Sequence, residues 1–206
     1  MESGTLSLPH LNDICTPLME FKFHKTLQTN FFGVTNGIST FLSHLQTRPA
    51  PTSIVITGSK QGITNPPGNA AYNASKAALR SFAESLSLTL SLAPATEHGV
   101  PSVHLLVPGW TYTRMTAGSL GGDPKEKPEG AWWPEQVAEY LEEKMEKSEF
   151  YIICPDNDTT EAVDRRRMRW GNEDTVERRP PLTRWRGTEW KRKADEWMGA
   201  EKAVGR

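Results

Sequence analysis

The stretch that decides the fold is IVITGSKQGITNPPGNAAYNASKAALRSFAESLSLTL, residues 54–90. It opens inside Ser53–Gly58, a short run rich in Ile and Val that ends in glycine, a pattern typical of a buried strand. It continues from about Gly68 to Leu92 as a segment rich in Ala, Ser and Leu, which predicts a helix. We therefore expect a strand, a turn and a long helix in this order.

Similar patterns flank this stretch on both sides. The apolar runs Ser102–Gly109 and Phe150–Pro155 predict two more strands. Helical patterns cover about His24–Gln46 and the segment PEQVAEYLEEKMEKS, which starts at Pro134, a residue suited to a first helical turn. Runs this apolar favour strands covered on both faces, as in parallel sheets. The alternation predicts an α/β fold, a partial Rossmann-type parallel sheet with flanking helices.

Composition limits the classes of function. The formal net charge of the 206 residues is −1, so no overall field attracts nucleic acid. Cys15 and Cys154 form neither a disulfide framework nor a metal-ligand spacing, which favours a reducing compartment. We find no secretory signal pattern and no apolar run long enough for a membrane span. We expect a cytoplasmic protein with no membrane or nucleic-acid partner and no metal.

Tyr72 and Lys76 are four residues apart, so both project from one face of the predicted helix. A tyrosine hydroxyl has a pKa near 10 and exchanges protons poorly at neutral pH. A neighbouring ammonium favours the phenolate and lowers that pKa, which suits the tyrosine to general acid/base chemistry. Ser59 lies thirteen residues before Tyr72, just beyond a strand, where open α/β sheets place their ligand crevice.

The chain contains its own control for this spacing. Tyr140 and Lys144 are also four residues apart, on an acidic helical segment, but no serine lies thirteen residues before Tyr140. We interpret this second pair as structural. The next predicted strand ends in PGWTYT, where a glycine lets the backbone approach a ligand closely and threonine hydroxyls follow.

On these motifs the chain resembles the classical short-chain dehydrogenase/reductases from about Lys25 to Asp156. The matching segments are NFFGV, TGSKQG, YNASK and PGWTYT. The resemblance implies an NAD- or NADP-dependent reaction on a small alcohol or carbonyl. It implies that a serine orients the carbonyl, a tyrosine is the general acid/base, a lysine tunes it and binds the cofactor ribose, and an asparagine anchors a relay water. These catalytic roles fall on Ser59, Tyr72, Lys76 and Asn30.

The resemblance also implies a nicotinamide site. It is formed by Tyr72 and Lys76 together with the segment after the strand, namely Pro108, Gly109, Thr111 and Thr113. It implies in addition a homodimer or homotetramer through the helices around 24–46 and 68–92. The substrate and the choice between NAD and NADP stay open.

The glycine-rich TGxxxGxG turn that begins this family has no counterpart before Asn30. We expect the first three strands and most of a fourth to be missing, with an open sheet edge as a consequence. Three explanations stay open: a fragment of a full enzyme, a truncated non-catalytic homologue that acts through protein association, and a cofactor-free isomerase or cyclase.

We divide the chain into an N-terminal segment (1–24), the catalytic half of the resembling domain (25–156) and a basic, Trp-rich extension (157–206). The extension is expected to be irregular, since Pro180 and Pro181 stop any helix. It is expected either to cover the site or to extend a dimer contact. Its arginine run is interpreted as a solvated face. Trp132 and Trp133, in the long loop 121–134, are either a substrate wall or a local anchor.

Overall fold

The computed structural model describes residues 17–94, 99–113, 116, 127, 129–155 and 159–203. Its centre is a parallel sheet of three strands in the order β1 (Ser53–Thr57), β2 (Ser102–Val107) and β3 (Tyr151–Ile153). Ile54 pairs with Val103, and Leu106 pairs with Ile152. The predicted α/β fold with a parallel sheet is confirmed.

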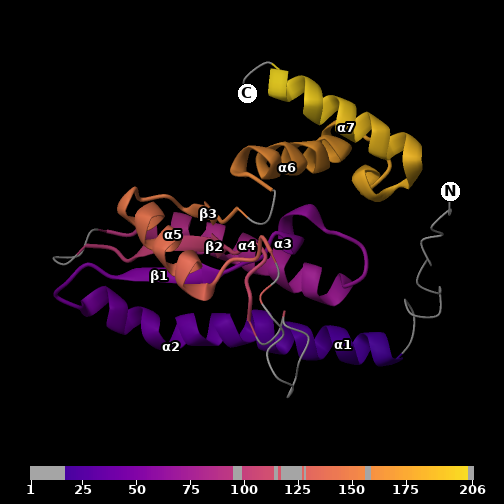
Figure 1. The fold of residues 1–206 in the computed structure, drawn as a ribbon. Coiled ribbons are helices and arrows are strands. Elements are labelled where there is room, and N and C mark those ends of the chain that lie inside the picture. Colours follow the sequence, from indigo (N-terminus) through magenta and orange to yellow (C-terminus); the bar gives the residue numbers. More distant parts are fainter. Residues whose placement is uncertain are drawn as a thin grey trace.

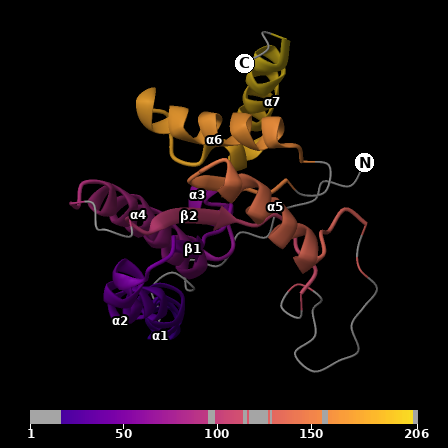
Figure 2. The ribbon, with the colours of Figure 1, turned by 90° about the vertical axis from the view of Figure 1, so that its left-hand side faces the viewer.

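Helices cover both faces of this sheet (Figure 2). Helix α4 (Ala70–Ser91) packs on one face together with α2 (Gly33–Thr47), and α5 (Pro134–Glu146) covers the other. The core between α4 and the strands is built from Ile56, Leu79 and Leu105, which are almost completely buried. These side chains come from the apolar runs and the Ala- and Leu-rich helix that the sequence pattern singled out.

The first predicted helix is longer than expected. It begins at Pro17 and runs through α1 (Pro17–Leu27), a π-helical turn η2 (Gln28–Phe32) and α2 to Thr47. Proline suits the first position of a helix because its missing N–H has no partner there anyway. The expected start near His24 was therefore seven residues too late, since the apolar spacing of α1 is weak and hides its first turns.

In the described part of the chain, only one face of strand β1 is covered by other elements. Its burial alternates, with Ile54 and Ile56 buried and Val55 38% exposed, so the prediction of cover on both faces is wrong for this strand. Within the described ranges, β2 is the one strand that pairs with β1. The expected open edge is thus present in this part of the chain.

The expectation of an irregular extension is wrong. Two helices, α6 (Glu161–Val176) and α7 (Gly187–Ala203), form a pair that lies beyond β3, away from the α1–α2 rod (Figure 1). The hydroxyl of Thr160 caps α6 by accepting the Val163 N–H at 3.3 Å. Pro180 and Pro181 do interrupt helix formation, but only in the turn between α6 and α7.

The turn between these helices, which includes the short 3-10 helix η3 (Thr183–Trp185), is held by a buried carboxylate. Asp174 accepts hydrogen bonds from the Thr183 N–H at 2.9 Å and from its hydroxyl at 2.6 Å. Trp170 is buried against Trp197, and the Arg179 guanidinium lies 4.4 Å from the Trp170 ring centre. Trp170 and Trp197 therefore form a small apolar contact between α6 and α7. In the described part of the chain, no helix combines the length and apolarity that a membrane crossing requires.

Candidate active site

The carboxyl ends of β1 and β2 meet at one edge of the sheet because the strands are parallel. The Gly58 N–H donates to the Leu106 carbonyl oxygen at 2.7 Å, which keeps the chain after β1 alongside β2. Ser59 follows directly, and Pro108 and Gly109 follow β2. The segments that the sequence singled out after the two strands are thus brought side by side.

Helix α4 presents Tyr72 and Lys76 to this edge. The helix begins after Asn69, whose side chain accepts the Tyr72 N–H at 3.3 Å and so fixes the first turn. One turn later, the Lys76 ammonium donates to the Thr57 carbonyl oxygen at 2.9 Å and lies 5.7 Å from the Tyr72 ring centre. Desolvation by burial lowers the pKa of Lys76 below its ordinary value.

A pocket of about 570 Å³ opens between these segments. Of the eight predicted site residues, seven line it: Ser59, Tyr72, Lys76, Pro108, Gly109, Thr111 and Thr113. The Thr111 hydroxyl donates to the Gly109 carbonyl oxygen at 3.2 Å, while the Thr113 N–H donates to the Thr116 hydroxyl at 2.8 Å. The segment after β2 is therefore a tight turn whose threonines face one cavity.

Asn30 is not among the residues that line the pocket. It lies in the π-helical turn η2, and its side-chain amide donates to the Ser75 hydroxyl at 3.1 Å. The Ser75 hydroxyl in turn donates to the Tyr72 carbonyl oxygen at 2.8 Å. Asn30 thus reaches the site indirectly, through the first turn of α4. Widened turns of this kind occur often at functional sites.

Ser59 is held by the turn that follows it. Its hydroxyl oxygen accepts the Gln61 N–H at 3.2 Å, at the start of the single-turn helix α3 (Gln61–Thr64). A Cβ placed on Gly62 would lie 2.5 Å from the Lys76 carbonyl carbon, so α3 can approach α4 this closely only with glycine there. The close approach sets the serine turn against the helix that carries Tyr72 and Lys76.

The far end of this turn is tied to α4 as well. The buried Asn73 side chain donates to the Asn65 side-chain oxygen at 2.9 Å and to the Pro66 carbonyl oxygen at 2.7 Å. Asn65 adopts a left-handed conformation, with φ at 46°, which asparagine tolerates better than most residues. Several hydrogen bonds therefore hold the loop TGSKQGITN in one conformation against α4.

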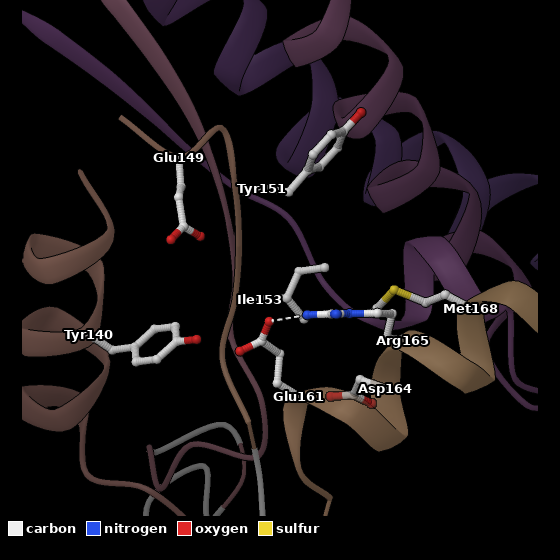
Figure 3. A pocket seen from close by; sticks show the side chains of 8 residues that line it. All are labelled: Tyr140, Glu149, Tyr151, Ile153, Glu161, Asp164, Arg165 and Met168. Carbon is white, nitrogen blue, oxygen red and sulfur yellow. Dashed lines mark hydrogen bonds and ion pairs between the residues drawn. The ribbon is translucent and has the colours of Figure 1, made fainter. Parts of the chain in front are cut away.

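The Tyr140–Lys144 pair has different surroundings. Tyr140 packs edge-on against Trp132, and burial raises the pKa of its hydroxyl. Lys144 forms an ion pair with Glu149 at 3.2 Å. Tyr140 lines a separate cavity of about 90 Å³, at which charged side chains of α6 gather beside β3 (Figure 3). Two of them, Glu161 and Arg165, form an ion pair at 2.7 Å.

Sequence reasoning missed part of the pocket lining. Trp110 lines the pocket directly after Gly109, and its position next to a strand end could have identified it. Pro134 and Val137 reach the pocket from α5, and nothing in the sequence signals this contact. The other missed lining residues are Thr57, Gly58, Lys60, Gln61 and Thr116.

Trp132 and Trp133 do not line this pocket. The Tyr112 N–H donates to the Trp132 carbonyl oxygen at 2.8 Å, and the Trp132 N–H donates to the Trp110 carbonyl oxygen at 2.9 Å. The Trp132 ring packs against the buried apolar cluster between α5 and the sheet, and the Trp133 ring packs edge-on against Tyr112. The two tryptophans fit a local anchor of the loop better than a substrate wall. Half of loop 121–134, like Cys15, lies outside the described residues.

Comparisons with known proteins agree with this architecture. The family model of the short chain dehydrogenases matches residues 15–121, which is more than half of the chain. No curated protein matches the chain. Among solved structures, a short chain dehydrogenase/reductase from Burkholderia phymatum, in complex with NAD, is similar at 24% sequence identity with a TM-score of 0.60.

That likeness covers 75% of this chain and 59% of the Burkholderia phymatum chain. The chain thus spans less than two thirds of the length of its structural neighbour, and at this identity the likeness concerns the fold. The family itself rests on the matched model together with the parallel sheet. The chain belongs to the short chain dehydrogenase family.

Proposed function

We propose that this chain carries the catalytic half of an oxidoreductase that interconverts an alcohol and a carbonyl with NAD or NADP. The observation that carries the proposal is one pocket, at the carboxyl ends of β1 and β2, lined by Ser59, Tyr72 and Lys76. These three side chains provide two hydroxyl groups and an ammonium in a place where open α/β sheets bind ligands. Tyr140 and Lys144, with the same spacing, have no such surroundings.

In the direction of reduction, the Tyr72 hydroxyl gives its proton to the substrate carbonyl oxygen as a hydride reaches the carbonyl carbon. A nicotinamide held in the pocket would supply or accept that hydride. The Lys76 ammonium lies 5.7 Å from the Tyr72 ring centre, and solvent returns a proton to Tyr72 after the transfer. In the direction of oxidation, the Tyr72 phenolate takes the proton of the alcohol.

Ser59 is suited to orient the substrate oxygen. In its bond with the Gln61 N–H, the serine oxygen is the acceptor, so that bond leaves the serine proton available for donation. A second donor next to Tyr72 would steady the oxygen on which negative charge develops. For Asn30 we propose a role in proton supply, which its hydrogen bond to Ser75 beside Tyr72 supports.

The described residues fit the nicotinamide end of the cofactor. A pocket of about 570 Å³ lies within the range of small-molecule sites, roughly 300–1,000 Å³. Lys76 and the hydroxyls of Thr111 and Thr113 offer hydrogen bonds to a ribose, an amide or a phosphate, and the backbone at Pro108 and Gly109 can approach a flat ring closely. A glycine-rich turn for the pyrophosphate does not precede Asn30 in the sequence.

Fluorescence titration of the purified chain with NADH and with NADPH tests the proposal. We expect saturable binding of at least one cofactor, and weaker binding after Lys76→Met. The absence of binding of either cofactor at millimolar concentration would refute an oxidoreductase function for this chain. A comparison of the two affinities would also decide between NAD and NADP.

A second candidate function is association with another copy of the chain, as a homodimer or homotetramer. The observation that favours it is a set of exposed, large apolar side chains. They lie on the helices around 24–46 and 68–92, and on the turn that precedes residue 24. Phe21 and Phe41 are each 61% exposed, and Leu88 is 60% exposed. Exposed apolar surface of this kind marks interaction sites in many soluble proteins.

Light scattering coupled to size-exclusion chromatography tests this association. We expect a mass above that of one chain for the wild type, and the mass of a single chain for Phe41→Lys. The matched control is Val176→Lys, since Val176 is 71% exposed on α6. A wild-type mass equal to one chain at high protein concentration would exclude self-association.

A further inference from the structure

The loop that carries Ser59 is clamped between α4 and the C-terminal helices. Figures 1 and 2 both place α3 directly next to α6. The Lys60 ammonium lies 2.5 Å from the Asp164 carboxylate, so the residue next to Ser59 is bound to a residue more than a hundred positions later. The Trp185 side-chain N–H donates to the Thr64 carbonyl oxygen at 3.4 Å, at the other end of α3.

The ion pair is shielded from solvent. The Lys60 side chain is 15% exposed and the Asp164 side chain is 5% exposed. Arg167 adds a second positive charge, with a guanidinium nitrogen 3.9 Å from the Asp164 carboxylate. An exposed ion pair would impose little order on a loop, whereas the loss of one partner of a shielded pair leaves the other as an uncompensated charge.

The geometry connects this pair to the serine hydroxyl. The Lys60 carbonyl oxygen accepts the N–H groups of Ile63 and Thr64, at 3.0 and 2.9 Å, so Lys60 is the residue from which α3 starts. The first N–H of α3, that of Gln61, is the one that holds the Ser59 oxygen. A shift of Lys60 would therefore move the group that orients Ser59.

We propose that Lys60 and Asp164 are positioning residues, through which α6 holds the Ser59 loop in place for reaction at the Tyr72 pocket. The inference rests on the function proposed above. It gives the C-terminal extension a role in the reaction, although none of the extension's described residues lines the pocket. The two charges act on Ser59 through the start of α3; Lys60 also lines the Tyr72 pocket, whereas Asp164 does not.

The test compares full-length variants Lys60→Met, Asp164→Asn and the charge swap Lys60→Asp with Asp164→Lys. The matched control is Arg165→Met, which removes an exposed ion pair with Glu161 from the same helix. Two measurements are made: amide hydrogen exchange at Gly62, Ile63 and Thr64, and steady-state kinetics that give kcat and KM for cofactor-linked turnover. Exchange at Leu105, in β2, reports whether the fold is intact.

We expect faster exchange at the three α3 amides in Lys60→Met and Asp164→Asn, with Leu105 unchanged. In both variants we expect kcat to fall by about 10- to 100-fold, a loss typical of a small displacement of a reacting group. The KM for cofactor should stay unchanged in Asp164→Asn, because Asp164 does not line the pocket. The charge swap should regain part of kcat, which a loss of stability alone would not explain. Arg165→Met should match the wild type in both measurements.

Unchanged exchange at the α3 amides in Lys60→Met would overturn the proposal, and so would faster exchange with kcat equal to that of Arg165→Met. If the wild type neither binds cofactor nor turns over, the proposed function fails by itself. The exchange data then decide alone whether α6 holds the loop. The failure of the function and the failure of this inference are thus distinguishable.

Discussion

The ammonium group of Lys76 bonds to the carbonyl oxygen of Thr57, the last residue of β1, at 2.9 Å. This bond joins the middle of α4 to the carboxyl end of the strand that leads to Ser59. It holds the positive charge at the edge of the sheet, next to the Tyr72 ring, and burial of the lysine follows from it.

Tyr72→Phe should lower turnover by about 10²- to 10⁴-fold, since it removes the proton donor and leaves the ring in place. Tyr140→Phe is the internal control, because Tyr140 has a lysine at the same spacing but lies against Trp132. Steady-state kinetics of both variants check the prediction. Equal losses in the two variants would contradict the assignment of the site.

Lys76→Met should change how stability depends on pH. Burial lowers the pKa of Lys76 below 10.5, so between the two values the unfolded chain binds more protons than the folded one. The free energy of unfolding of the wild type should therefore rise relative to that of Lys76→Met as the pH increases toward 10.5. Urea unfolding of both proteins between neutral and alkaline pH measures this difference. A constant difference across that range would argue against a desolvated ammonium.

Gly62→Ala should destabilise the protein by about 1 to 3 kcal/mol and lower turnover, because the added methyl group pushes α3 away from α4. Gly171→Ala is the matched control. Gly171 lies inside α6 with no atom within 4 Å of an added Cβ, so alanine should stabilise that helix by up to about 1 kcal/mol. Denaturant unfolding of both variants checks the signs. A stabilising Gly62→Ala would show that the close approach of the two helices is dispensable.

Asp174→Ala should cost about 2 to 4 kcal/mol, since two donors of Thr183 lose a buried charged acceptor. Glu173→Ala is the neighbouring control. Glu173 lies 3.8 Å from Arg179 and is 35% exposed, so its removal should cost no more than about 1 kcal/mol. Thermal unfolding and far-UV circular dichroism of both variants measure the difference. Similar costs for the two substitutions would mean that the turn between α6 and α7 does not depend on Asp174.

The pattern around Tyr72 could be predicted because it depends on local geometry. Residues four apart in a helix share a face, and the ends of parallel strands meet at one edge. Tyr72, Lys76 and Ser59 could therefore be expected near one another before any contact was known. The helices of the extension were not predicted, because its proline and arginine content suggested an irregular segment and the N-terminal cap at Thr160 was overlooked. The buried hydrogen bonds of Asp174 could not be predicted, since they form only within the folded unit.

The sequence by itself determined the strand–turn–helix order, the family and the grouping of the tyrosine, lysine and serine, because short-range spacing governs all three. Only the tertiary structure decided which distant residues complete the site. Lys60 had 25 acidic residues as candidate partners, and packing of α6 beside α3 selected Asp164. Packing of α5 likewise brought Val137 to the pocket. Such pairings depend on how whole elements pack in space, and no local pattern encodes that.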